Sequence, residues 1–76
     1  MVQIPKPDEI YKHYKGDNYK IILISRLESH PEQILVSYIP LYETESEIKV
    51  WTRTLENFLE EVEVDGKKVK RFSLST

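Results

Sequence analysis

The feature that most restricts how this chain can fold is an Asp-Gly pair near its C-terminus. Asp65 and Gly66 separate two short runs of alternating apolar and charged residues, which predicts a β-hairpin with a two-residue type I′ turn. A loop of this length fixes the register, so the expected cross-strand pairs are Val64–Lys67, Glu63–Lys68, Val62–Val69 and Glu61–Lys70. One face of the hairpin therefore carries an apolar pair, and the other carries pairs of opposite charge.

The same register shows where the first strand of the hairpin begins. Extended backwards, it would put Leu59 on the charged face, so the alternation must break near Glu60. Before this break the apolar residues have helical spacing, which predicts a helical turn at residues 54–59 with Thr54 as its N-cap. Residues 48–53 alternate again, as in a strand that leads into the helical turn.

The first half of the chain predicts further short strands separated by polar turns. A turn at residues 16–18 separates a first strand, which ends near Lys15, from a second strand at residues 19–27. The polar residues 28–32 then lead to a third strand at residues 33–42. The second strand is apolar on both faces, which predicts that it bends sharply and serves two sheets.

Five to six short strands and one helical turn in 76 residues predict a mainly β fold. We expect a small, SH3-like bent β-barrel, with an OB-like barrel as the alternative. The domain is expected to cover residues 11–76. Residues 1–10, which contain Pro5 and Pro7, are expected to be a poorly ordered lead-in.

Charge and composition restrict the function. Eleven basic and thirteen acidic residues give a net charge of −2, which argues against a dedicated binder of duplex DNA but leaves room for a local basic patch. The chain has no cysteine, and its two histidines lack metal-ligand spacing, so we expect no metal and no cofactor. No signal-peptide or membrane-length apolar run occurs, and the expected location is the cytoplasm, away from membranes.

Several motifs can be recognised together in the sequence. They are Tyr11-Lys-His-Tyr-Lys-Gly16, Leu41-Tyr42, Trp51-Thr-Arg53, Leu55-Glu-Asn-Phe-Leu-Glu60 and Val62-Glu-Val-Asp-Gly-Lys-Lys-Val-Lys-Arg-Phe72. In this order they resemble the bacterial family called domain of unknown function 1653, over about residues 11–72. The resemblance implies an SH3-like fold and brings no established activity.

The chain departs from the family pattern in two places. After Arg26 the family usually has a polar loop, whereas residues 27–31 here have one extra residue. Thr54 stands where the family has proline, and the loop between Tyr42 and Trp51 is longer. If the polar loop serves a function across the family, this member has lost or altered it.

The candidate site is a recognition surface of aromatic and arginine side chains. Arginine binds carboxylates and phosphates with two parallel hydrogen bonds and stacks on aromatic rings. We expect the ligand-binding residues to come from the set Tyr11, His13, Tyr14, Lys15, Arg26, Tyr42, Trp51, Arg53 and Arg71. Trp51 and Arg53 share a strand face, but the favoured interpretation of Trp51 places it in the core, with Tyr38 and Phe58.

For Arg53 and Arg71, ligand binding and pairing with carboxylates of the chain are equal alternatives.

Three hypotheses about function remain open. The first is a non-catalytic binding module for a peptide or small anionic ligand, working as a monomer or weak homodimer. The second is an RNA- or ribosome-associated barrel, against which the net charge weighs. The third is an enzyme that acts on a small phosphorylated or nucleoside-like ligand with His13 as its acid–base group. The first is favoured, because no acid–base constellation stands out.

Overall fold

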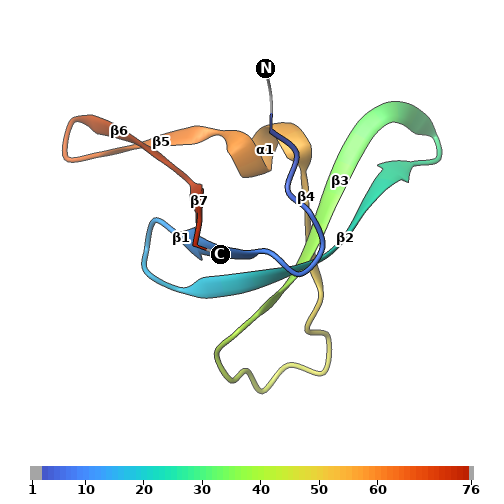
Figure 1. The fold of residues 1–76 in the computed structure, drawn as a ribbon, viewed down its shortest axis with the longest axis horizontal. Helices are drawn as coiled ribbons and strands as arrows, with labels where there is room; N and C mark the ends of the chain where they lie inside the picture. Colours follow the sequence, from blue (N-terminus) through green and yellow to red (C-terminus); the bar gives the residue numbers. More distant parts are fainter. Residues whose placement is uncertain (1–2, 76) are drawn as a thin grey trace.

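The computed structural model describes residues 3–75 and has a mainly β fold, as the sequence predicts (Figure 1). Within this described range, seven strands and one short helix follow one another. They are β1 (Ile10–His13), β2 (Asn18–Leu27), β3 (His30–Pro40), β4 (Trp51–Thr54), α1 (Leu55–Leu59), β5 (Glu61–Val64), β6 (Lys67–Lys70) and β7 (Phe72–Leu74).

The strands form two antiparallel sheets, and the predicted closed barrel is not seen among residues 3–75. Five strands pair in the order β4-β3-β2-β1-β7, and β5 pairs with β6 in a separate hairpin. The edge strands β4 and β7 are separated along the chain by α1 and this hairpin, which projects to one side of the sheet in Figure 1. The chain turns into α1 directly after Thr54, and β4 and β7 form the two opposite edges of the five-stranded sheet.

The predicted hairpin and helical turn are both confirmed. The register of β5 and β6 has the four predicted pairs, and positive φ angles of 51° at Asp65 and 80° at Gly66 are those that a type I′ turn needs. At the start of α1, the hydroxyl of Thr54 accepts a hydrogen bond of 3.1 Å from the backbone N–H of Asn57. Thr54 is therefore the N-cap.

Some strand boundaries differ from the prediction, each for a local reason. β3 begins at His30 because β2 and β3 are joined by a short turn that pairs Leu27 with His30. β4 begins at Trp51, three residues later than predicted, because continuing its register would put residue 49 opposite Pro40. Proline has no N–H to donate, so the ladder stops there.

The core lies under the five-stranded sheet and is largely aromatic. Its buried residues are Tyr11, Ile21, Val36, Tyr38, Phe58 and Phe72. Phe58 from α1 stacks on Phe72 from β7 with ring centroids 4.2 Å apart, so the helix is fixed to the edge of the sheet. The prediction that β2 serves two sheets is wrong. Ile22 and Leu23 remain 37% and 45% exposed, because no second sheet covers them.

Candidate functional site

Arg53 is a half-buried cation at the edge of the core. It lies opposite Val36 in the pairing of β3 with β4, which turns its side chain toward the core face of the sheet. Its Nε donates a 2.8 Å hydrogen bond to the Tyr38 hydroxyl, and its Nη1 donates to Oδ1 of Asn57. Both acceptors are neutral, and among residues 3–75 no carboxylate lies within ion-pair distance of Arg53. Its charge is therefore not compensated by an acidic partner.

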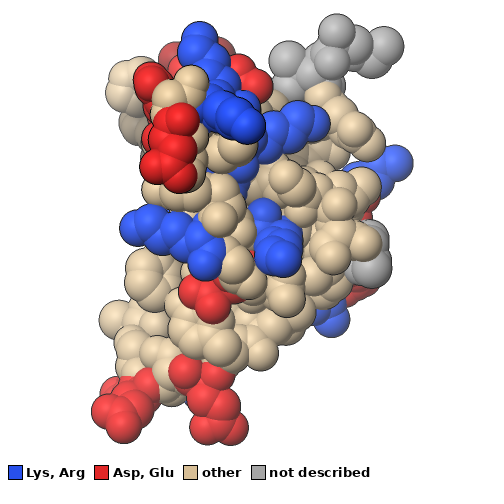
Figure 2. Space-filling model, turned by 90° about the vertical axis from the view of Figure 1, so that its left-hand side faces the viewer, with Lys and Arg blue, Asp and Glu red and all other residues tan. Residues whose placement is uncertain are grey.

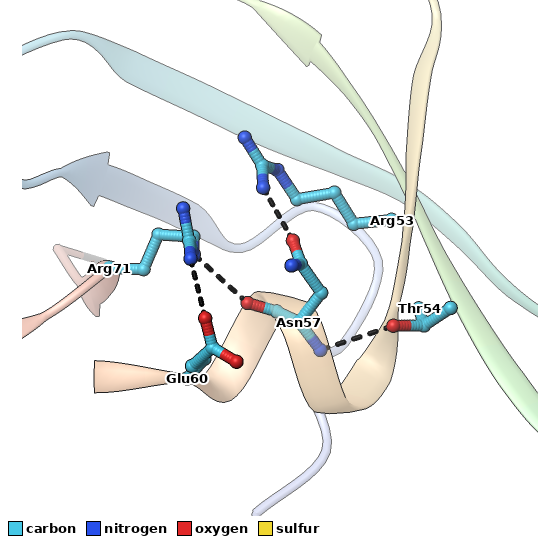
Figure 3. Close-up of polar contacts among 5 residues, drawn as sticks. All are labelled: Arg53, Thr54, Asn57, Glu60 and Arg71. Carbon is cyan, nitrogen blue, oxygen red and sulfur yellow. Dashed lines mark hydrogen bonds and ion pairs between the residues drawn. The ribbon is translucent and has the colours of Figure 1, made fainter. Parts of the chain in front are cut away.

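Arg71 brings a second guanidinium group to the same place from the segment before β7. Its Nε donates to the backbone carbonyl of Asn57 at 3.1 Å, and its Nη2 forms an ion pair of 2.7 Å with Glu60. Figure 3 shows both guanidinium groups on the same side of α1, with the Asn57 amide beneath Arg53. For Arg71, pairing with a carboxylate is thus present, whereas Arg53 has no such partner among residues 3–75.

Asn57 joins the two arginines and was not among the residues predicted from the sequence. The Thr54 cap fixes its backbone N–H, its side-chain oxygen accepts from Arg53, and its carbonyl accepts from Arg71. The available indication was its place in the motif Leu55–Glu60, between the two arginine-containing motifs. The side-chain amide orients the Arg53 guanidinium without neutralising it, and the backbone carbonyl of the same residue holds the guanidinium of Arg71.

His13 lies beside this pair at the end of β1. Its ring packs edge-on against Phe72, with centroids 5.0 Å apart, and the Arg53 guanidinium carbon lies 5.5 Å from the centre of the same Phe72 ring. The His13 Nδ1 accepts a 3.1 Å hydrogen bond from the backbone N–H of Lys15. In the neutral ring the proton is therefore on Nε2, which is left as a donor.

The charge of His13 is governed by the same surroundings. Burial is the main cause of a pKa below its ordinary value of 6.5. Positive charges lower the pKa further, and they belong to Arg53, Arg71 and Lys15. The Asp17 carboxylate acts in the opposite direction but does not cancel them.

Three tyrosines form a run of rings with His13. The Tyr14 ring lies 4.5 Å from that of His13, with the Lys15 ammonium 5.9 Å from its centre. On the other side, Tyr19 lies 6.4 Å from His13 and 5.9 Å from Tyr42. The hydroxyls of Tyr19 and Tyr42 are 3.4 Å apart, and burial is the main cause of a raised pKa at Tyr19.

These groups form one continuous patch, which we call the Arg–Tyr surface. It consists of His13, Tyr14, Lys15, Tyr19, Tyr42, Arg53 and Arg71. Six of these belong to the predicted set, and Tyr19 was predicted only as the start of a strand. Tyr14 and Tyr42 are 39% and 43% exposed, so both rings can be reached from solvent.

The three other predicted residues lie elsewhere. Tyr11 is a core residue, 6% exposed, and burial next to Glu9 raises its pKa to about 12. Arg26 is exposed on the β2–β3 hairpin, where its Nη1 donates to the carbonyl of Pro31 at 2.9 Å. The favoured placement of Trp51 in the core is wrong, because it is 51% exposed on the edge strand β4. Tyr38 and Phe58 are core residues, as predicted.

Charges are unevenly distributed on this side of the molecule. In Figure 2, Lys and Arg side chains lie across the middle and at the top of the face, where acidic side chains lie beside the upper ones, while the lower end carries acidic side chains. That end is at the level of the loop between β3 and β4 in Figure 1, which contains Glu43, Glu45 and Glu47. A basic patch therefore exists locally in a chain of net charge −2.

Within residues 3–75, no three His, Asp or Glu side chains come together as metal ligands would. No helix in that range has the length and apolar character needed to cross a membrane.

Comparison with known proteins gives one family. The sequence profile described as "Protein of unknown function (DUF1653)" matches residues 9–74. Among solved structures, the fold is similar to the crystal structure of a DUF1653 protein from Bordetella bronchiseptica, with 29% sequence identity and a TM-score of 0.77. The similarity covers 91% of this chain and 85% of that one. No match was found among curated proteins.

Proposed function

Because the chain belongs to the DUF1653 family, whose function is unknown, we propose a function from the geometry of its surface. The protein is a non-catalytic binding module, and its Arg–Tyr surface binds an anionic group, either a carboxylate or a phosphate, of a protein or small-molecule ligand.

The observation that carries the proposal is the uncompensated charge of Arg53. A charge in a partly buried position costs free energy unless it is paired, and here both hydrogen-bond acceptors are neutral. A guanidinium has five N–H donors, so Arg53 keeps donors beyond these two bonds. The second guanidinium, of Arg71, lies beside it on the same side of α1 (Figure 3). Two such groups suit an anion with several oxygens.

His13 supports binding rather than catalysis. Its Nδ1 is occupied by the backbone of Lys15, so the neutral ring offers a ligand only the Nε2 proton. The hydrogen bonds described for His13 include none to a carboxylate that would orient it as a general base. We assign His13 the role of a hydrogen-bond donor to the bound anion.

We also propose that the five-stranded sheet is an SH3-like arrangement that stays open between β4 and β7. The support is the family resemblance, together with a helical turn placed just before the C-terminal strands. Backbone nuclear Overhauser effects between β4 and β7 would instead show a closed barrel and overturn this assignment.

The binding proposal is tested by titrating the 15N-labelled protein with inorganic phosphate and with acetate, followed by NMR. We expect amide shifts in residues 13–15 and around Asn57 and Arg71, because these border the proposed site. The Arg53→Gln variant, which removes the charge but keeps a polar side chain, should bind at least about tenfold more weakly, equivalent to about 1.4 kcal/mol.

A matched control is available in the same chain. Arg26→Gln removes an arginine from the distant β2–β3 hairpin and should leave the titration unchanged. Well-dispersed spectra of both variants establish that each is folded. Equal binding by the two variants, or no shifts at all with wild-type protein, would overturn the proposal.

A further inference from the structure

We propose that the ligand of the Arg–Tyr surface is a nucleoside monophosphate, whose phosphate lies on Arg53 and Arg71 and whose base stacks on an exposed tyrosine ring. This inference rests on the proposed function, because it requires the anion to bind at the guanidinium pair. It adds that the bound phosphate is attached to a nucleoside.

The first support is the position of the exposed rings. Tyr14 and Tyr42 are 39% and 43% exposed, and both belong to one run of neighbouring rings next to the arginines. Every nucleobase has a flat π-face that stacks on such side chains. A free phosphate or an acetate ion has no flat ring that could stack on these tyrosines.

The second support is the short path from the cations to a ring. The Arg53 guanidinium carbon is 5.5 Å from the Phe72 centroid, His13 is 5.0 Å from Phe72, and Tyr14 is 4.5 Å from His13. These groups lie in consecutive contact, and we place the phosphate at the Arg53 end of this path and the base at its Tyr14 end. The His13 ring contacts both Phe72 and Tyr14, so its Nε2 proton belongs to a group on this path.

The third support concerns the length of the ligand. A nucleic acid strand would continue beyond the patch and would bring further phosphates with it. The loop after Tyr42 carries Glu43, Glu45 and Glu47, and Figure 2 shows acidic side chains at that end of the face. The net charge of −2 adds to the repulsion of a polyanion. The surface therefore fits a single nucleotide better than RNA.

The test compares four probes in the same NMR titration: inorganic phosphate, adenosine 5′-monophosphate, adenosine and a six-residue oligoadenylate. We expect the monophosphate to bind at least tenfold more tightly than phosphate or adenosine. Its amide shifts should include the neighbours of Tyr14 or Tyr42 as well as those of Arg53. The oligoadenylate should bind no more tightly than the monophosphate.

Variants separate this inference from the proposed function. The double variant Tyr14→Ala with Tyr42→Ala should reduce the affinity for the monophosphate to about that for phosphate, whereas Arg53→Gln should weaken the binding of both. A matched control is Trp51→Ala, which removes an exposed ring outside the patch.

Each other outcome gives a definite answer. If the monophosphate binds no more tightly than phosphate, the nucleotide inference fails and the anion-binding function stands. If neither phosphate nor the monophosphate binds, both fail. Tighter binding of the oligoadenylate would overturn the inference in favour of single-stranded RNA.

Discussion

At the scale of single residues, the guanidinium of Arg53 and the imidazole of His13 are coupled through a shared neighbour. Both pack against the Phe72 ring, and the charge of Arg53 is one cause of the lowered pKa of His13. A cation next to a half-buried imidazole disfavours the imidazolium form. The surface thus keeps His13 neutral and its Nε2 proton available, while the permanent charge is provided by arginine.

This coupling predicts the effect of removing the charge. In Arg53→Gln the pKa of His13 should rise toward its ordinary value of 6.5, because one of its three positive neighbours is gone while burial remains. A pH titration of the His13 ring followed by NMR measures this. Arg26→Gln should leave the His13 titration unchanged, and an equal shift in both variants would refute the coupling.

The same pKa has a consequence for stability. Since the folded-state pKa of His13 lies below the unfolded value of 6.5, the unfolded chain binds the proton more readily. The stability contribution of neutral His13 is present above pH 6.5 and is lost as the pH falls from there toward the folded-state pKa. Urea unfolding of wild type and His13→Asn between pH 5 and 8 tests this. The free energy of unfolding should vary less with pH in the variant than in wild type. Identical pH profiles would contradict it.

At the scale of elements, α1 links the two edge strands of the five-stranded sheet through side-chain contacts. The sheet edges β4 and β7 are not paired with each other, yet Arg53 from β4 and Arg71 next to β7 both bond to Asn57 of α1. Phe58 from the same helix stacks on Phe72. The geometry of the cationic pair therefore depends on whether this one-turn helix is formed.

The N-cap provides a test of that dependence. Thr54→Ala removes the acceptor for the Asn57 N–H and should lower the free energy of unfolding by about 1 kcal/mol, within a range of about 0.5–2 kcal/mol. Phosphate binding should weaken as well, because Asn57 no longer holds the arginines in place. Thr54→Ser keeps the hydroxyl and should retain most of both properties.

These changes are measured by urea unfolding and by the phosphate titration. If Thr54→Ala lowers stability and leaves phosphate binding as strong as in wild type, α1 does not position the arginines.

At the scale of the whole molecule, stability depends on a few aromatic contacts. For 76 residues the expected free energy of unfolding is about 4–11 kcal/mol by per-residue scaling. Truncation of a fully buried phenylalanine typically costs about 3–5 kcal/mol. A single core ring can thus account for much of the free energy of unfolding.

Phe58 and Trp51 make a contrasting pair of variants. Phe58 is 0% exposed and contacts three other rings of the core, so Phe58→Ala should lower the free energy of unfolding by about 3–5 kcal/mol. Trp51 is 51% exposed, and Trp51→Ala should change the free energy of unfolding by less than about 0.5 kcal/mol. Urea unfolding at neutral pH measures both, with Phe58→Leu as a milder variant if Phe58→Ala does not fold. A larger effect at Trp51 than at Phe58 would contradict the description of the core.

The sequence allowed local features to be predicted better than distant ones. The hairpin at Asp65–Gly66 and the cap at Thr54 follow from turn chemistry and from the parity of neighbouring residues, and both were correct. Barrel closure depends on whether the edge strands β4 and β7 pair with each other, a contact between distant segments that no local pattern encodes. Trp51 was misplaced because a single-sequence pattern gives the face of a strand but not whether another layer covers that face.

The candidate site shows the same limit. Arg53 and Arg71 were identified because each lies in a recognisable sequence motif. The motifs could not show that Arg26 lies apart from them, in the β2–β3 hairpin. Asn57 and Tyr19 were missed because each has an ordinary local role, one in a helical turn and the other in a strand. Their place in the surface follows only from contacts between elements.

The most direct test of the central claim observes the arginine side chains themselves. The chain has three arginines, so their Nε–H resonances can be assigned and followed by NMR while phosphate is added. If Arg53 and Arg71 hold the anion, their resonances shift in a saturable manner with one common dissociation constant, and that of Arg26 remains in place. Shifts of equal size at all three arginines, or none at Arg53, would contradict the claim.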